Sequence, residues 1–185
     1  GLTIGEMFND VTETIYGKMF VPATDTGVGL ALQLAGEFCY EEQLNVEKYI
    51  QEDAAVLDVG ANLGVFSLFA ARRIDPFKGF VIGFEPQKYL YRLCIANAVV
   101  NNLNHCHFIN SAIHSKLSRV TFPEVDYSFP GNFGSLCVRE QPSTPGRTTT
   151  VECVKLDSLN LPRVSVVKID VEDAIEDTFM RGTKL

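Results

Sequence analysis

The stretch from Val56 to Gly64, with the sequence VLDVGANLG, decides the fold class of this chain. It contains the end of an apolar run, Ala54 to Val59, which is too short for a helix and stops at a glycine. We therefore expect a strand that is buried on both faces, as in a parallel sheet. Glycine lets the backbone bend tightly and approach a ligand closely. A helix expected from Gly64 to Arg73 presents free N–H groups at its start, which suits a carboxylate or a phosphate.

The segments that follow this stretch alternate between strand and helix. Phe80 to Phe84 predicts a second buried strand, and Pro86 suits the first position of the next helix. Cys106 to Ile113 predicts a third strand. Such alternation implies a parallel sheet with right-handed crossovers, so the sequence predicts an α/β chain with a Rossmann-like open parallel sheet. The helix after Pro86 has one apolar face, formed by Leu90, Leu93, Cys94 and Ala98.

The second half of the chain is less regular. It predicts three more strands, a long loop and a final helix, in the order Ser118–Tyr127, Ser128–Gly146 (the loop), Thr149–Val154, Val164–Ile169 and Asp173–Arg181 (the helix). Loops of this length are often functional, so Gly131 to Ser135 either covers a substrate or lies at the surface. The last strand would have an unpaired edge, which is an aggregation risk. We expect a sheet that lacks its C-terminal strands, or a second copy of the chain covering that edge.

The chain of 185 residues has room for one domain with a sizeable core. We divide it into a lead-in segment, residues 1–50, and a C-terminally incomplete α/β domain, residues 51–185. Within the lead-in segment, Gly17–Pro22 predicts a strand and Glu41–Ile50 predicts a helix.

Composition excludes several classes of protein. The formal net charge of −7 disfavours a surface that coats nucleic acid. A membrane span is not expected, because the chain contains no run of about 20 apolar residues. The five cysteines are odd in number and lack a C-x-x-C pair, so they indicate reduced thiols in a cytoplasmic protein. Cys106 would point away from His105 and His107 on a strand, so we expect no metal site there.

Glu85 follows the second predicted strand. Its carboxylate can accept hydrogen bonds from both hydroxyls of a ribose there, and each such bond is worth about 1.5–3 kcal/mol. Two classes of cofactor use a glycine turn next to such a residue. A dinucleotide needs G-x-G-x-x-G, but Asn62 occupies the second glycine position and Val65 the third. An acidic residue two positions before G-x-x-x-G is typical of S-adenosylmethionine enzymes, and Asp58 supplies it. Asp58 suits the ammonium of that cofactor, directly or through water, and the turn suits its carboxylate.

The stretch VLDVGANLG, taken with GFEP, INSAI, LDSL and VKIDVE, resembles the FkbM-type S-adenosylmethionine-dependent methyltransferases. The resemblance runs from about Gly17 to Arg181. It implies a class I methyltransferase fold and O-methylation of a hydroxyl on a sugar or a natural-product-like small molecule. The sequence departs from the family at Asp173, where a glycine is usual, and in the expected absence of the last strands, which puts substrate contacts from that part in doubt.

The same resemblance implies a cofactor site built from the ends of four strands. Its residues are Asp58, Gly60, Ala61, Asn62 and Gly64 for the methionine part, Glu85 for the ribose, Pro86, Gln87, Ser111 and Ala112 around the adenine, and Asp170. Methylation of a hydroxyl also needs a general base, for which Asp170, Glu172 and His114 are the candidates. Alternatively, Glu172 stabilises a helix N-terminus. The alternative for His114 is that it is a surface residue in a turn. Lys168 is either an ion-pair partner or a site residue.

Three functions stay open at this point. The first is a methyltransferase acting on a small-molecule or glycan acceptor. The second is an NAD-dependent oxidoreductase, which would have to tolerate Asn62 in the phosphate turn and would need a nicotinamide-binding half. The third is a truncated cofactor-binding module without activity. Binding of S-adenosylhomocysteine or of NAD separates the first two.

Overall fold

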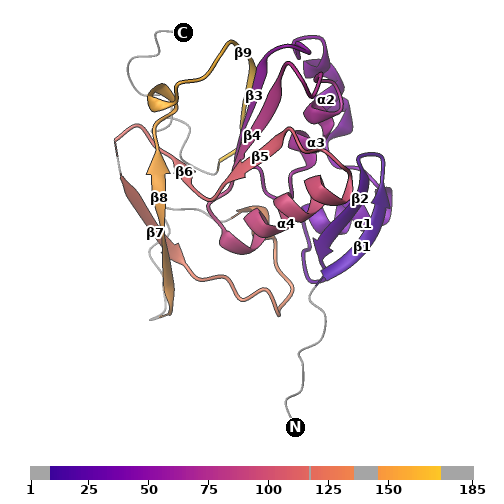
Figure 1. The fold of residues 1–185 in the computed structure, drawn as a ribbon. Coiled ribbons are helices and arrows are strands. Elements are labelled where there is room, and N and C mark those ends of the chain that lie inside the picture. The colour runs from indigo at the N-terminus through magenta and orange to yellow at the C-terminus, as the bar shows by residue number, and fades with distance from the viewer. Residues whose placement is uncertain (1–8, 117, 136–145, 172–185) are drawn as a thin grey trace.

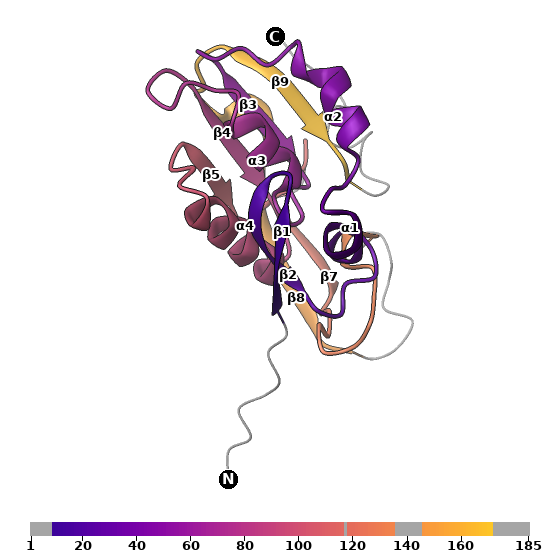
Figure 2. The same cartoon turned by 90° about the vertical axis from the view of Figure 1, so that its right-hand side faces the viewer.

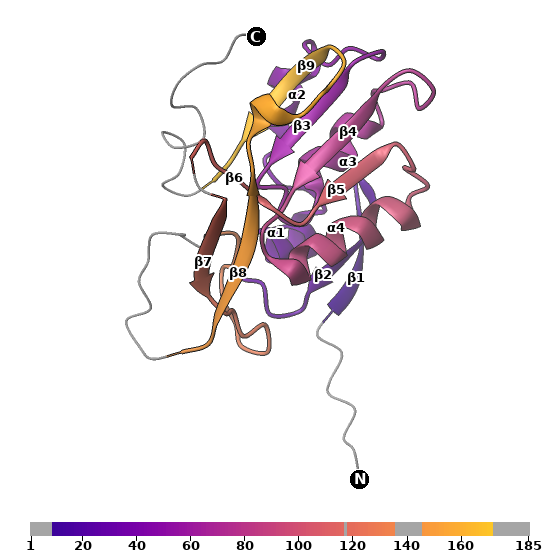
Figure 3. The same ribbon diagram turned by 60° about the vertical axis from the view of Figure 1, so that its left-hand side comes forward.

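The structure is a computed structural model that describes residues 9–116, 118–135 and 146–171. Its centre is a parallel four-stranded sheet in the order β5-β4-β3-β9 (Figures 1 and 3). The strands are β3 (Ala55–Val59), β4 (Phe80–Phe84), β5 (Cys106–Ile109) and β9 (Val164–Ile169). The chain moves from β3 outward to β5 and then returns to place β9 on the other side of β3. This topology confirms the predicted Rossmann-like α/β fold.

Helices α3 (Val65–Ala71) and α4 (Lys88–Val100) connect the first three strands. Val56 and Val81 of the sheet belong to the hydrophobic core that includes both helices. The neighbouring residues Leu57 and Val59 belong to a second core, on the opposite face. Successive side chains of a strand point to opposite faces, which is why β3 is apolar at nearly every position and entirely buried.

Residues 9–50 pack against the helix-covered face of the sheet (Figure 2). They form an antiparallel hairpin, β1 (Asn9–Thr14) and β2 (Gly17–Pro22), followed by α1 (Val28–Ala35) and α2 (Tyr40–Glu47). The buried Asn97 of α4 joins this hairpin to the domain, because its Oδ1 accepts a hydrogen bond from Phe20 N (2.6 Å) and its Nδ2 donates one to Leu63 O (3.0 Å). Met19 and Leu32 therefore lie in the same core as α3 and α4.

A smaller three-stranded sheet lies below the main one in Figure 3. It has the order β6-β8-β7, with β6 at Ala112–Ile113, β7 at Arg119–Pro123 and β8 at Thr148–Val154. Short 3₁₀ turns, η1 (Phe133–Ser135) and η2 (Leu156–Ser158), complete the described elements. The end of β8 and η2 pack against the face of the main sheet that the helices leave open.

Several predicted boundaries are wrong for identifiable physical reasons. The predicted third strand, Cys106–Ile113, splits into β5 and β6, because Asn110 turns its Nδ2 to the carbonyls of Glu85 and Pro86 (2.9 Å each) and the chain leaves the sheet there. Helix α4 begins at Lys88 rather than at Pro86, since Gln87 N donates to the Glu85 carboxylate and has an extended backbone.

Other predicted segments differ in extent. Helix α2 spans Tyr40–Glu47 instead of Glu41–Ile50, and α3 is shorter than Gly64–Arg73 at both ends. Strand β1 and helix α1 were absent from the prediction, and the predicted helix Asp173–Arg181 lies outside the described residues. In the part of the chain that the structure describes, no helix has both the length and the apolar character to cross a membrane.

Candidate cofactor-binding site

A cavity of about 390 Å³ lies where the carboxyl ends of β3, β4 and β9 meet. The strand order reverses between β3 and β9, and ligands of open α/β sheets bind at such a switch point. The volume is within the range of about 300–1,000 Å³ that is usual for small-molecule sites. Most of the predicted site residues line this cavity, namely Gly60, Ala61, Asn62, Glu85, Pro86, Gln87, Ser111, Ala112 and Asp170.

The turn after β3 needs glycine at its first position. Gly60 has a φ of +80°, in the left-handed region, and its N–H donates to Phe84 O at 3.0 Å. A Cβ atom on Gly60 would lie 2.1 Å from the carbonyl oxygen of Asp170. The end of β9 therefore rests directly against the turn, which a side chain at this position would prevent. Gly64, with a φ of +82°, has a structural role instead: it precedes α3 and packs near Leu68 and Phe108, away from the cavity.

Glu85 is buried at the end of β4 with only 4% of its surface exposed. Its Oε2 accepts a hydrogen bond from Asn62 N (2.8 Å) and its Oε1 accepts one from Gln87 N (2.8 Å). Burial raises the pKa of Glu85 to about 7, with a smaller contribution from Asp58, while the two N–H donors and Lys168 act in the opposite direction. Each carboxylate oxygen has two lone pairs, so both retain capacity for a hydroxyl donor.

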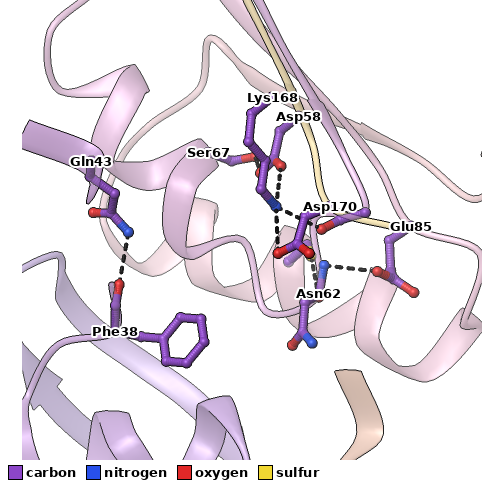
Figure 4. Close-up of polar contacts among 10 residues, drawn as sticks. Phe38, Gln43, Asp58, Asn62, Ser67, Glu85, Lys168 and Asp170 are labelled. Carbon is purple, nitrogen blue, oxygen red and sulfur yellow. Dashed lines mark hydrogen bonds and ion pairs between the residues drawn. The ribbon is translucent and has the colours of Figure 1, made fainter. Parts of the chain in front are cut away.

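Asp58 lies behind the turn rather than on the cavity (Figure 4). Its side chain is fully buried; Oδ2 accepts a hydrogen bond from Ser67 Oγ (2.7 Å), and Oδ1 lies 3.2 Å from Lys168 Nζ. Of the two modes that we expected for Asp58 and a cofactor ammonium, direct contact is therefore not available in this geometry, and contact through water stays a prediction. The carboxylate instead supports the turn from inside.

Lys168 connects three parts of this site (Figure 4). Its ammonium donates to Gly60 O (3.1 Å), pairs with Asp58, and lies 3.5 Å from Asp170 Oδ2. Burial disfavours the charged ammonium, but the two carboxylates outweigh it and raise the pKa of Lys168 above its ordinary value. Lys168 also lines the cavity, so the two roles considered for it, ion-pair partner and site residue, coincide.

The loop that contains Gly131–Ser135 borders the cavity through Asn132, Gly134 and Ser135. The side chain of Gln87 holds it there, because Nε2 donates to Phe133 O (2.7 Å) and Oε1 accepts from the Tyr127 hydroxyl (2.8 Å). A Cβ atom on Gly134 would lie 2.6 Å from Nδ2 of Asn62, so the loop touches the glycine turn. Gln87 was predicted to shape the adenine side of the site. In the structure its side chain holds the loop that borders the cavity.

Replacing Gln87 with leucine is expected to lower the free energy of unfolding by about 2–4 kcal/mol, because the partly buried Tyr127 hydroxyl and the buried Phe133 carbonyl both lose their partner. Tyr127→Phe removes only one of these bonds and should cost about half as much. Urea denaturation of the two variants beside the wild type measures both effects. Equal stability of all three proteins would show that Gln87 does not hold the loop.

Sequence reasoning missed one side of the cavity. Residues from the lead-in segment line it, namely Val28, Phe38, Cys39, Glu42, Gln43 and Val46. The spacing of these residues in the sequence does not indicate a site. The nearest predicted element was the helix Glu41–Ile50. His114, considered as a surface turn residue, also lines the cavity, and its Nδ1 accepts a hydrogen bond from Lys116 N (3.1 Å). Glu172 lies outside the described residues.

Two buried polar atoms test whether the cavity fits a polar ligand. Asn62 Oδ1 and Ser111 Oγ have no hydrogen-bond partner among the described residues, and both residues line the cavity. Buried polar groups are nearly always bonded, so such exceptions call for an explanation. With the free lone pairs of Glu85, they offer a polar ligand partners at the ends of three strands. This donor and acceptor set fits a nucleoside carrying an amino-acid end.

Several solved structures are similar to part of this chain. They include the SAM-dependent methyltransferase from Agrobacterium tumefaciens, with 15% identity, coverage of 60% of this chain and 34% of that one, and a TM-score of 0.43. Trm5b from Pyrococcus abyssi has 18% identity, coverage of 57% and 28%, and a TM-score of 0.43. Precorrin-6y C5,15-methyltransferase from Geobacter metallireducens has 15% identity, coverage of 38% of each chain, and a TM-score of 0.35. The chain thus spans well under half the length of each of these proteins.

No curated protein matches the chain. A model of the methyltransferase FkbM domain matches residues 58–180, which is well over half of the sequence. The match begins at Asp58 in β3, just before the glycine turn, and extends past the end of β9, so it includes the strand ends that form the cavity. The chain belongs to the FkbM methyltransferase family.

Proposed function

We propose that this protein is an S-adenosylmethionine-dependent methyltransferase that acts on a hydroxyl of a small-molecule or glycan acceptor. One observation carries the proposal: the glycine turn after β3 and the buried Glu85 after β4 share one cavity with Asp170 at the switch point of the sheet. Membership of the FkbM family supports the reaction class. The choice of oxygen as the acceptor atom is supported by the family resemblance and by the carboxylate of Asp170 on the cavity.

The cavity residues divide the work of holding the cofactor. Glu85 would accept the ribose hydroxyls. The adenine would lie near Pro86, Gln87, Ser111 and Ala112, which all line the cavity. The unpartnered Oδ1 of Asn62 would accept a donor from the amino-acid end. When bound, S-adenosylmethionine supplies a methyl group on a sulfonium, which is a good leaving group.

The protein then has to align the acceptor and remove its proton. Asp170 is the candidate base, because it lines the cavity and its side chain remains 70% exposed for contact with a hydroxyl. Lys168 Nζ lies 3.5 Å from Asp170 Oδ2 and forms an ion pair with this carboxylate. Glu172, two residues further along the chain, remains a second candidate for this role.

Methyl transfer is tested by incubating the protein with S-adenosylmethionine labelled in the methyl group and a panel of phenols, sugars and polyketide alcohols. We expect label in at least one hydroxyl compound, and at least a hundredfold lower rate for Asp170→Asn if it is the base. Label in amines alone would contradict the oxygen acceptor. An unchanged rate in Asp170→Asn would remove Asp170 as the base.

Glu85→Gln is expected to weaken binding of S-adenosylhomocysteine by about 10- to 100-fold, since it loses one or two hydrogen bonds to a charged group. Calorimetric titration measures the affinity directly. Glu152→Gln is the matched control, because Glu152 is exposed on β8, pairs with Arg119 and does not line the cavity. An affinity of Glu85→Gln equal to that of the control would exclude Glu85 from the site.

Binding of S-adenosylhomocysteine should also tighten by up to about tenfold between pH 6 and pH 8. The raised pKa of Glu85, about 7, means that ionisation of its carboxyl group is completed over this range. Its ionised fraction rises from about one tenth to about nine tenths, and hydroxyl donors favour the ionised form. Titrations across this pH range should give a flat profile for Glu85→Gln. A flat profile for the wild type would mean that the carboxylate does not contact the ligand.

Two further parts of the proposal concern the cellular location and the oligomeric state of the protein. A cytoplasmic location is supported by the free thiols of Cys39, Cys94, Cys106 and Cys153 in the described part of the chain. A homo-oligomer is supported by β9, which within the described residues pairs with β3 alone. Light scattering tests the second point: a monomer at all concentrations would argue against it.

A further inference from the structure

A second wall of the cavity has no part in the cofactor site described above. Its apolar side chains come from the lead-in segment and from α3, and they are Val28, Phe38, Val46, Val65 and Phe66. In Figure 4 the ring of Phe38 points toward the glycine turn at Asn62. Phe38 and Asn62 line the same cavity, so the ring is directed toward the polar turn.

Buried polar groups hold Phe38 in this position. Its carbonyl accepts hydrogen bonds from the Tyr16 hydroxyl (3.0 Å) and from Gln43 Nε2 (2.9 Å), and its N–H donates to the same hydroxyl at 3.3 Å. Tyr16 is 2% exposed and Gln43 is 6% exposed. These bonds fix the backbone of Phe38, and residues held by supporting hydrogen bonds are typical of preorganised binding sites.

The charges around the cavity are predominantly negative. Glu42, Glu85 and Asp170 all line it, and Lys168 is the only lysine or arginine among the described lining residues. The ammonium of Lys168 is already paired with Asp58 and Asp170. A phosphate ester would place its negative charge among these carboxylates without a free cation, and like charges disfavour such a ligand.

We infer that this wall is the acceptor subsite and that it takes an uncharged hydroxyl compound with a flat apolar face, which contacts the ring of Phe38. The inference rests on the proposed function for the identity of the second ligand as a methyl acceptor. Phe38 is then a specificity-determining residue, since an aromatic ring gains most from a flat apolar partner. Phosphate esters of the same compounds are rejected by the acidic lining.

A matched pair of probes, 2-naphthol and 2-naphthyl phosphate, tests this inference by fluorescence titration of the protein saturated with S-adenosylhomocysteine. We expect 2-naphthol to bind at least tenfold more tightly than its phosphate ester. Phe38→Ala should weaken 2-naphthol binding by about tenfold and leave the affinity for S-adenosylhomocysteine within twofold. Phe77→Ala is the control, because Phe77 is 96% exposed and lies outside this cavity.

Val46→Phe provides a second variant should Phe38→Ala fail to fold, because added bulk on the same wall should also reduce 2-naphthol binding by about tenfold. Equal or tighter binding of the phosphate ester would overturn the inference. Unchanged 2-naphthol binding in Phe38→Ala, or in Val46→Phe if Phe38→Ala does not fold, would overturn it as well. If S-adenosylhomocysteine fails to bind, the proposed function fails, and the same titrations without it still decide whether the apolar wall binds 2-naphthol.

Discussion

Replacing Lys168 with methionine is expected to lower the free energy of unfolding by about 3–5 kcal/mol, the usual cost of breaking a buried ion pair by removing one partner. Methionine keeps the apolar stem but leaves the carboxylate of Asp58 buried without its cation. The substitution also leaves the carbonyl of Gly60 without the hydrogen bond that the ammonium donates to it. Urea denaturation at pH 7 measures the loss, and binding of S-adenosylhomocysteine should weaken together with stability.

Two controls separate this explanation from a general effect of losing a lysine. Lys155→Met changes an exposed lysine and should leave stability within about 0.5 kcal/mol. The double variant Lys168→Met, Asp58→Asn removes the unpaired charge, so it should recover a large part of the loss. A double variant less stable than Lys168→Met alone would contradict the view that the buried charge of Asp58 causes the damage.

Gly60→Ala is expected to destabilise the protein by about 4 kcal/mol or more, or to prevent folding. The added methyl group would approach within 2.1 Å of the Asp170 carbonyl oxygen, which is backbone and cannot rotate away. The substitution also places an alanine in the left-handed region, which alone costs about 1–2 kcal/mol. Urea denaturation, or the soluble yield if the variant does not fold, gives the result.

Gly36→Ala isolates the second of these two costs. Gly36 has a similar φ of +71°, but the nearest atom to its added Cβ would be 3.7 Å away. This variant should therefore lose only the conformational cost of about 1–2 kcal/mol. Equal losses for the two alanine variants would show that the contact between the turn and β9 is not tight.

The sequence predicted the parts of the site that local patterns determine. A buried strand that ends in glycine marks the turn at Gly60, and Glu85 and Asp170 each follow an apolar strand. Parallel strands end at one edge of a sheet, so these residues had to converge, and the structure places all three on one cavity.

What the sequence could not predict depends on contacts between distant segments. Asp58 was expected to bind the cofactor ammonium, directly or through water. The local pattern does not show that Lys168, on a strand far along the chain, is its neighbour. That pairing follows from the register of β3 with β9, in which Asp58 and Lys168 are direct partners. The wall around Phe38 could not be predicted for the same reason, since tertiary packing alone brings the lead-in segment to the cavity.

Calorimetric titration with S-adenosylhomocysteine, beside NAD as the control ligand, tests the central claim most directly. The turn at Gly60, the unpartnered Asn62 Oδ1 and the carboxylate of Glu85 predict binding of one S-adenosylhomocysteine per chain and no binding of NAD. Binding of NAD with equal or higher affinity, or of neither ligand, would contradict the assignment of this cavity to S-adenosylmethionine.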